Sequence, residues 1–241
     1  MAQIKSYNRP LISIITVVYN GELFIEDTIL SVIDQTYQNF EFIIIDGGST
    51  DTTLEIIEKY KNYIDVLVSE KDDGIYDAMN KGIDISSGKW VNFMNAGDGF
   101  YNDKVLEKVA LELNPNKICL YGGVSWKNGK KSFPFYMPYI LRMPNHQAMF
   151  TKLEWLQKNK FDLNFSISAD LDMKMKINAV NGFSKSTANI CLCVEGGVSQ
   201  DPANLIKVQC EMYLIHKKNY LFTWPYLVMD NLYQLVKKIF K

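Results

Sequence analysis

The sequence predicts an α/β fold in which helices flank a mainly parallel β-sheet. Apolar runs with strand character alternate with segments of helical periodicity through the first half of the chain. Several runs are apolar throughout, which is typical of strands covered on both faces. A polar, glycine-rich turn follows each of the first four runs. In a parallel sheet these turns meet at the carboxyl edge, where ligands bind.

The elements of the first half are expected in the following order. Five strands are expected, at Ile12–Tyr19, Phe40–Asp46, Asp65–Glu70, Lys89–Asn95 and Lys117–Val124. A first helix presents one apolar stripe, formed by Ile25, Ile29, Val32 and Ile33. A second begins near Thr52, because Thr52 and Glu55 have the spacing of a capping box. A third carries Ile75, Met79 and Ile83.

The second half is less regular. An Asn-Gly pair predicts a hairpin over Trp126–Pro138. A strand or turn at Asn145–Gln147, a helix near Ser168–Asn181 and a strand pair holding Cys191 and Cys193 follow. We expect one domain over residues 1–200 and a C-terminal helical tail over 201–241.

The end of that tail has two faces. Apolar and polar residues fall on opposite sides of a helix, the apolar set being Val228, Leu232, Leu235, Val236 and Ile239. Such a helix packs on its own domain, on a second subunit in a homodimer, or on an anionic membrane surface through residues 221–241. The pattern leaves these three alternatives open.

Charge and cysteine content exclude several function classes. The net charge of −1 offers no excess of cations for tracking nucleic-acid phosphates. The four cysteines have no CxxC pair and no zinc spacing, and Cys191 and Cys193 are expected as small buried groups on one strand face. The apolar runs are too short to cross a bilayer and no signal peptide is visible, so a cytoplasmic location is expected.

The polar turns predict how a ligand is held. They are Tyr19–Gly21, Asp46–Asp51, Glu70–Gly74 and Asn95–Asp98. No G-x-G-x-x-G follows the first strand, and no P-loop occurs. A bound nucleotide would therefore be held by carboxylates and a metal ion rather than by a glycine cradle.

Eight stretches, in order, resemble the family 2 glycosyltransferases of the GT-A fold. They are Ser13–Asn20, Ser31–Tyr37, Ile45–Asp51, Gly74–Gly82, Asn95–Asp98, Asn145–Gln147, Ala169–Asp170 and Gly196–Ser199. The resemblance implies a Rossmann-like GT-A domain and inverting transfer from a nucleotide-diphosphate sugar, with UDP as first expectation and GDP as second. It is strongest to short enzymes of exopolysaccharide, capsule and O-antigen assembly, which implies a lipid-linked glycan acceptor.

The resemblance also implies roles for individual residues. Binding of the nucleotide sugar falls to Thr16, Tyr19, Asn20, Asp46, Asp77, Asn80, Lys81 and Asn95. Asp98 is the implied ligand of a divalent ion, Mn²⁺ or Mg²⁺, because hard cations take oxygen ligands and bridge diphosphates. His146 is implied to contact the diphosphate or the acceptor. Structural alternatives stand beside these roles: core contact for Tyr19, helix capping for Asp46 and a solvated helix face for Lys81.

An inverting transfer needs a general base on the acceptor side. Asp170 matches the family motif, and Asp172 is the alternate. Residues two apart on a helix point about 200° apart, so only one of them faces a given site. Ala169 stands where the family usually has a glutamate.

The sequence bears on two other function classes. Nucleotidyltransferases need a basic, glycine-rich loop after the first strand, and Tyr19–Glu22 is not one. A catalytically degenerate protein that binds nucleotide sugars or carbohydrates stays an alternative, because Asn95–Asp98 has a single carboxylate.

Overall fold

The computed structural model describes residues 11–127, 143–194 and 201–218. Their strands are β1 Ile12–Val18, β2 Phe40–Asp46, β3 Val66–Ser69, β4 Trp90–Phe93, β5 Gly99–Phe100, β6 Cys119–Trp126, β7 Met149–Lys152 and β8 Phe183–Cys193. The α-helices are α1 Ile25–Ile33, α2 Thr53–Lys59, α3 Ile75–Ile85, α4 Val105–Glu112, α5 Leu153–Lys158, α6 Ala169–Ala179 and α7 Leu205–Lys218. Short 3₁₀ turns are η1 Lys61–Tyr63, η3 His146–Ala148 and η5 Pro202–Asn204.

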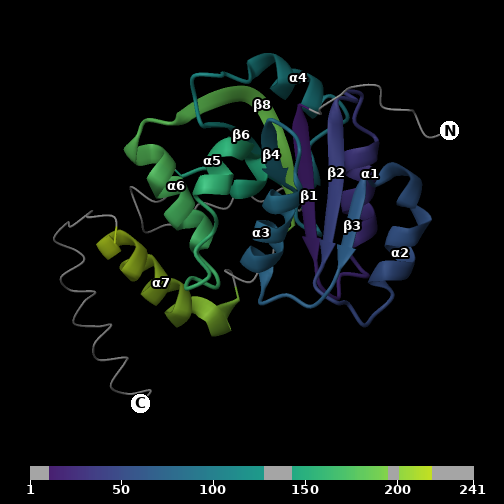
Figure 1. Ribbon diagram of the computed structural model, residues 1–241, viewed down its shortest axis with the longest axis horizontal. Coiled ribbons are helices and arrows are strands. Elements are labelled where there is room, and N and C mark those ends of the chain that lie inside the picture. The colour runs from purple at the N-terminus through teal and green to yellow at the C-terminus, as the bar shows by residue number, and fades with distance from the viewer. Residues whose placement is uncertain (1–10, 128–142, 195–200, 219–241) are drawn as a thin grey trace.

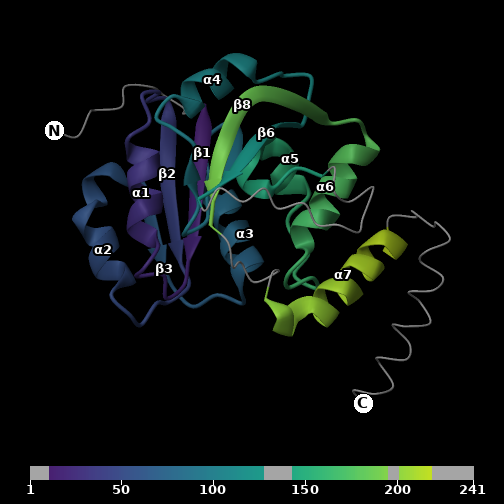
Figure 2. The same ribbon diagram turned by 180° about the vertical axis from the view of Figure 1, so that it is seen from behind.

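The eight described strands form one sheet with helices on both faces (Figures 1 and 2). Its order is β3-β2-β1-β4-β7-β6-β8-β5. β1, β2, β3 and β4 pair in parallel, as the alternation of strands and helices predicts. The α/β fold class is confirmed.

β1 is buried throughout because both of its faces are covered. Ile12 and Ile14 point into a core shared with α1, α2 and α4. Ile15 and Val17, one position out of phase, point into a second core formed with α3, α5 and α6. This alternation is the period of two that a strand imposes on its side chains. The sheet therefore separates two apolar layers.

The second half of the sheet is mixed rather than parallel. β7 runs antiparallel to both β4 and β6, and β5 runs antiparallel to β8. The expected strand pair around Cys191 and Cys193 is one long strand, β8, which lies parallel to β6 with register shifts between Tyr121 and Val124. Asn145–Gln147 leads into the 3₁₀ turn η3, which continues directly into β7.

The second predicted helix is present as α2, but its capping box is not. The Thr52 hydroxyl donates to Glu22 Oε2 at 2.6 Å, so it does not cap the helix. Asp51 Oδ1 instead accepts the Thr53 amide proton at 3.0 Å. The prediction was wrong because a carboxylate one residue earlier reaches the free amide and Glu22 attracts the hydroxyl.

The C-terminal helix α7 lies beside α6 (Figures 1 and 2). Glu211 of α7 is buried and accepts the amide protons of Ser166, Ile167 and Ser168. These residues directly precede α6, so α7 holds the segment that leads into that helix. The two-faced stripe at 228–239, the hairpin at 128–138 and Gly196–Ser199 lie outside the described residues. Within the described part, no helix has the length and apolar character needed to cross a membrane.

Candidate functional site

The carboxyl edge of the parallel strands gathers the predicted polar turns. Gly48, Gly74 and Gly97, one in each of the turns after β2, β3 and β4, have positive φ angles of 82°, 109° and 101°. Glycine adopts such angles without the clash that a Cβ atom causes. The glycine content of these turns therefore reflects tight reversals at the ends of strands.

The turns after β1 and β2 are joined to each other. Asn20, with φ of 47°, accepts the Thr50 amide proton on its Oδ1 at 2.9 Å. Its own amide donates to Ser49 Oγ at 2.8 Å. The neighbouring Tyr19 side chain is 63% exposed, so its ring is free to stack on a flat ligand rather than cover the core.

Asp46 ends β2 with a fully buried carboxylate. It accepts protons from the amides of Gly48 and Ser49 and from the Ser69 hydroxyl, which lies 2.7 Å away. These bonds shape the turn and tie it to β3. These three bonds leave about one lone-pair position on the carboxylate, and a bond from Asp46 to a base or ribose stays a prediction. Capping of α2 falls to Asp51 instead.

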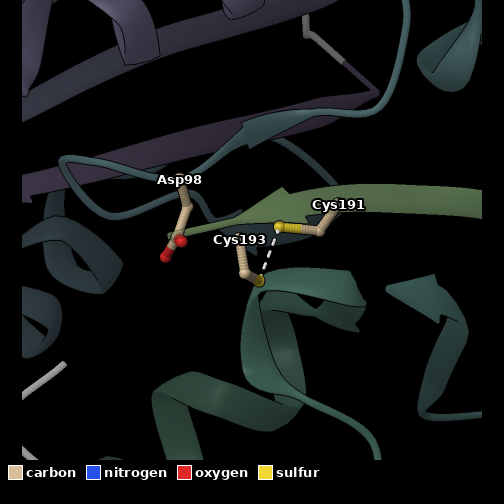
Figure 3. Close-up of side chains that lie close together, drawn as sticks. All are labelled: Asp98, Cys191 and Cys193. Atoms are coloured by element: carbon tan, nitrogen blue, oxygen red, sulfur yellow. Dashed lines mark hydrogen bonds between the residues drawn. The ribbon is translucent and has the colours of Figure 1, made fainter. Parts of the chain in front are cut away.

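Asp98 lies in the turn after β4 and is 8% exposed. Its Oδ2 accepts from Gln147 Nε2 at 2.8 Å, and its Oδ1 accepts from the Val194 amide at 3.0 Å. Figure 3 shows Asp98 beside the end of β8. The turn is fixed in place by Thr28 of α1, whose hydroxyl donates to the Asp98 carbonyl and accepts from Gly97.

The donor set at Asp98 fits a hard divalent ion. A carboxylate has about four lone-pair positions, and protein donors use two of them here. The nearby Asn95 Oδ1 is buried and has no hydrogen-bond partner among the described residues. One charged and one neutral oxygen are thus available, and the remaining ligands would come from diphosphate and water.

A second group of polar side chains begins at Asn95. Its Nδ2 lies 3.1 Å from His146 Nε2, and His146 Nδ1 lies 3.3 Å from Asp170 Oδ2. The three residues come from the end of β4, from η3 and from the first turn of α6. Asn92 holds η3 in position, since its amide donates to the carbonyl oxygens of Gln147 and Met149.

Asp170 is the most heavily bonded member of this group. Its side chain is 17% exposed and accepts from Tyr76 Oη at 3.1 Å and from Lys174 Nζ at 2.6 Å. Burial acts to raise the pKa of Asp170, but Lys174 and then His146 outweigh burial and hold that pKa below its usual range. The carboxylate is therefore ionised at neutral pH.

His146 and Gln147 connect the two groups. His146 contacts Asp170, and the next residue, Gln147, donates to Asp98. The Asn145–Gln147 stretch therefore links Asp170, the implied base, to Asp98, the implied metal ligand. Sequence reasoning did not assign roles to Gln147, Tyr76 or Lys174. The i, i+4 spacing of Asp170 and Lys174 was a usable signal for that ion pair.

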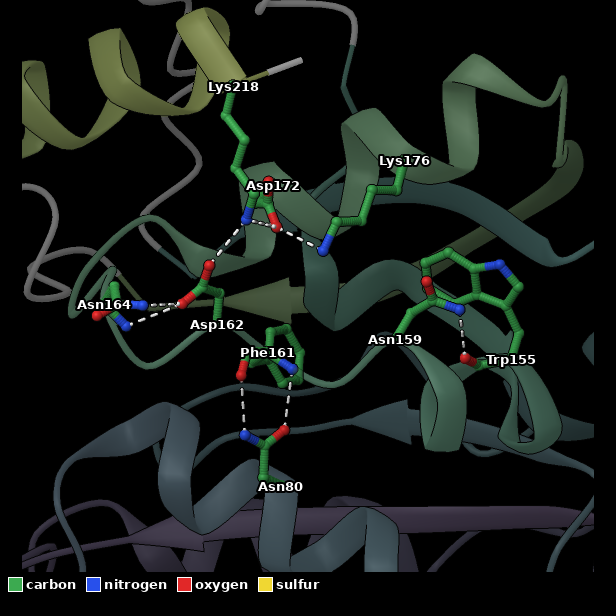
Figure 4. Close-up of polar contacts among 9 residues, drawn as sticks. All are labelled: Asn80, Trp155, Asn159, Phe161, Asp162, Asn164, Asp172, Lys176 and Lys218. Carbon is green, nitrogen blue, oxygen red and sulfur yellow. Dashed lines mark hydrogen bonds and ion pairs between the residues drawn. The ribbon is translucent and has the colours of Figure 1, made fainter.

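The Asp172 side chain lies between Lys176 and Lys218 (Figure 4). It is 1% exposed, with Lys176 Nζ at 2.7 Å and Lys218 Nζ of α7 at 3.6 Å. The prediction of Asp172 as the alternate base is therefore wrong. Its carboxylate is enclosed between α6 and α7, where it pairs with Lys176 and Lys218 and holds the two helices together.

Two further predicted contacts are internal. Asn80 of α3 is buried, and both ends of its amide bond to the backbone of Phe161 at 3.0 Å (Figure 4). The buried Thr16 hydroxyl donates to the Met94 carbonyl at 2.7 Å. These side chains join elements of the fold and are not free to bind a ligand, which corrects their expected role.

Lys81 and Asp77 lie on the more exposed face of α3. Lys81 Nζ is 2.8 Å from Glu70 and 3.5 Å from Asp77, and the hydrogen bond to Glu70 raises the pKa of Lys81. Asp77 also accepts the Asp73 amide proton. The pair stabilises the turn after β3, and phosphate binding by Lys81 stays a prediction.

Residues 13–173 match the family described as glycosyl transferase family 2. The chain belongs to glycosyl transferase family 2. It is 30% identical over 178 residues to a PGL/p-HBAD biosynthesis glycosyltransferase of Mycobacterium tuberculosis, covering 69% of each chain. It is 38% identical over 116 residues to the putative teichuronic acid biosynthesis glycosyltransferase TuaG of Bacillus subtilis, covering 47% of this chain and 45% of that protein.

Solved structures confirm the GT-A-like fold of this family member. TarS residues 1–349 of S. aureus, crystallised with UDP, superposes with a TM-score of 0.68 at 21% identity, covering 85% of this chain and 64% of that one. A mannosyltransferase of Pyrobaculum calidifontis, in complex with GDP-Man and Mn²⁺, gives a TM-score of 0.64 at 18% identity, covering 90% and 66%. The chain thus spans about two thirds of these structures.

Proposed function

We propose that this protein is an inverting glycosyltransferase that moves a sugar from a nucleotide-diphosphate sugar to a hydroxyl of a cell-surface glycan. One observation carries the proposal: consecutive residues of η3 tie Asp170 to Asp98 at the carboxyl edge of the sheet. Such an edge receives ligands in open α/β sheets. The similarity to glycosyltransferases of PGL/p-HBAD biosynthesis and of teichuronic acid biosynthesis supports a role in cell-surface polysaccharide synthesis.

The donor is proposed to lie across the turns after β1 and β4. The exposed Tyr19 ring would stack on the base, and Asn20 would fix the turn that presents it. Asp98 and Asn95 Oδ1 would hold Mn²⁺ or Mg²⁺, whose chemistry is to neutralise charge on the departing diphosphate. UDP stays the first expectation and GDP the second, since solved structures of similar fold are complexes with UDP, UDP-GlcNAc and GDP-Man.

Asp170 is the proposed general base. The acceptor oxygen forms a bond to the anomeric carbon as the bond from that carbon to the diphosphate oxygen breaks, and the hydroxyl proton passes to Asp170. Because Asp170 is ionised and accepts three protein hydrogen bonds, about one lone-pair position remains for the acceptor hydroxyl. Attack from the side opposite the diphosphate inverts the anomeric centre.

His146, Tyr76 and Lys174 are proposed to orient this carboxylate. Each bonds to Asp170, and each comes from a different place in the chain: η3, α3 and one turn further along α6. A base held from three directions loses little orientational freedom on reaching the transition state.

The test is release of nucleoside diphosphate from UDP-, GDP- and dTDP-sugars, with Mn²⁺, Mg²⁺ or a chelator. We expect slow, metal-dependent hydrolysis of one donor, lost in Asp98→Asn and retained in Asp103→Asn, an exposed carboxylate five residues away. Absence of both turnover and metal-dependent donor binding would contradict the proposal.

A second candidate is a protein that binds nucleotide sugars without transferring them. The close ion pair of Asp170 with Lys174 favours it, because a carboxylate with a depressed pKa is a weak proton acceptor. Tight donor binding without turnover, unchanged by added glycan acceptors, would select this candidate. A lipid-linked acceptor, a cytoplasmic location, homodimer formation and membrane contact through residues 221–241 stay predictions.

A further inference from the structure

A group of sulfur ligands lies against the carboxylate of Asp98. Cys191 and Cys193 end β8, and their Sγ atoms are 3.2 Å apart on the same strand face. A carboxylate oxygen of Asp98 and the two sulfurs all lie within 4.8 Å of one another. Figure 3 shows the three side chains converging from the turn after β4 and from β8.

We propose that Asp98, Cys191 and Cys193 form a binding site for a thiophilic divalent cation, Zn²⁺ being the physiological candidate, and that its occupancy inhibits the enzyme. This goes beyond the proposed glycosyl transfer, which uses a hard cation on oxygen ligands. Thiolates select zinc and cadmium, whereas carboxylates, carbonyls and water suit Mg²⁺ and Mn²⁺.

The separation of the two sulfurs is close to that in a zinc site. Zn–S bonds of about 2.3 Å in a tetrahedron place two sulfurs about 3.8 Å apart. The two sulfurs lie 3.2 Å apart, so they would have to move apart by well under an ångström to bind zinc. The fourth position would be filled by water or by the buried Met94 sulfur, which lies 4.0 Å from Cys191 Sγ.

Charge balance also favours the site. Binding Zn²⁺ to two thiols releases two protons, so the group of one carboxylate and two sulfurs keeps its net charge of −1. A buried ion normally loses favourable hydration. Here the two charges of the cation replace two protons, and the interior gains no net charge.

Inhibition follows from the sharing of Asp98. Its carboxylate keeps about two lone-pair positions beside Gln147 and the Val194 amide, and two divalent cations on one such carboxylate would repel each other. Val194 also follows Cys193 directly, so movement of that cysteine toward a cation would disturb the turn. Zinc and the catalytic cation are therefore expected to exclude each other.

The direct test uses reduced, metal-free, full-length protein titrated with Cd²⁺. We expect one Cd²⁺ per chain, with thiolate-to-cadmium charge-transfer absorption in the ultraviolet. Cys191→Ala and Cys193→Ala should each weaken binding about 100-fold or more. Cys119→Ala is the matched control, because Cys119 is equally buried but lies outside this group of ligands.

Asp98→Asn provides a variant that keeps both thiols. It should retain the charge-transfer band at weakened affinity, which separates ligand loss from misfolding, and circular dichroism checks each variant. The proposal is overturned if the wild type shows no band, if the band survives unchanged in Cys191→Ala and Cys193→Ala, or if Cys119→Ala abolishes it equally.

The functional readout is Zn²⁺ inhibition of metal-dependent donor hydrolysis. Inhibition should be about tenfold or more weaker in Cys193→Ala than in Cys119→Ala. Equal inhibition in both variants would overturn the inhibitory role. Because the cadmium titration needs no turnover, failure of the proposed transferase activity would leave the metal site separately testable.

Discussion

In the turns after β1 and β2, polar side chains bond mainly to backbone groups of the same turn or of the neighbouring one, as Asp46 does with Gly48 and Ser49 and as Asn20 does with Thr50. Around η3 and α6, polar side chains bond to one another, as in the series Asn95, His146 and Asp170. The first arrangement fixes the shape of a surface. The second sets the charge and direction of a few functional groups. We therefore expect substitutions in the turns after β1 and β2 to affect stability and donor affinity. Substitutions around η3 and α6 should affect turnover.

The largest expected effect is that of Asp170→Asn. Removal of a general base typically lowers turnover by about 10²- to 10⁴-fold, and the amide also loses the charge that pairs with Lys174. Asp172→Asn is the matched variant on the same helix. It should cost about 1–3 kcal/mol of unfolding free energy, from its bonds to Lys176 and Lys218, and leave kcat nearly unchanged. Transfer kinetics and urea unfolding of both variants check the pair. Equal losses of kcat would remove the distinction between the two aspartates.

The same two aspartates show what the sequence alone can decide. Helical geometry established that only one faces a site, and the family motif favoured Asp170. The packing partner that encloses Asp172, Lys218 of α7, lies 46 positions along the chain and has no local signal.

The parallel strands and their glycine-rich turns were predictable because apolar runs and turn residues are local signals. The antiparallel insertion of β7 between β4 and β6 was not, because β7 has only four residues and its pairing is set by long-range packing. Within the candidate site, motifs in the sequence had indicated Asp98 and His146, whose roles stay predictions. The role expected of Asn80 was wrong, because a sequence does not reveal that a polar side chain already bonds to a distant backbone group, here that of Phe161.

A smaller effect is expected for His146→Ala. Loss of the imidazole leaves Asp170 with Tyr76 and Lys174 only, so the carboxylate should turn away from the acceptor. Misplacement by about 1 Å costs up to about 100-fold in rate, and we expect a 10- to 100-fold fall in kcat with donor KM within about twofold. His146→Asn, whose amide nitrogen stands near the position of Nδ1, should restore part of kcat. A change confined to donor KM would assign His146 to the donor side instead.

Tyr19→Ala and Asp46→Asn separate donor affinity from stability within the turns after β1 and β2. Base stacking on an aromatic ring contributes about 1–3 kcal/mol, so Tyr19→Ala should raise the donor Kd about tenfold without changing stability, because the ring is exposed. Asp46→Asn should lower the unfolding free energy by about 1–3 kcal/mol through its buried bonds. Calorimetric donor titration and chemical denaturation separate the two effects. Donor affinity that falls more in Asp46→Asn than in Tyr19→Ala, at equal stability, would reverse these assignments.

The smallest expected effect is on the pH dependence of stability. The pKa of Asp170 is lower in the folded protein than in the unfolded chain, with burial opposed by Lys174 and His146. Its ionised form therefore stabilises the fold fully above the unfolded pKa of about 3.9, and this contribution is lost as the pH falls from there toward the folded pKa. Urea unfolding between about pH 6 and 3 should show a shallower acid loss of stability in Asp170→Asn than in the wild type. If stability falls equally with pH in both proteins, Lys174 and His146 do not favour the ionised form of Asp170. The proposed base would then lack the electrostatic support that keeps it deprotonated for the acceptor.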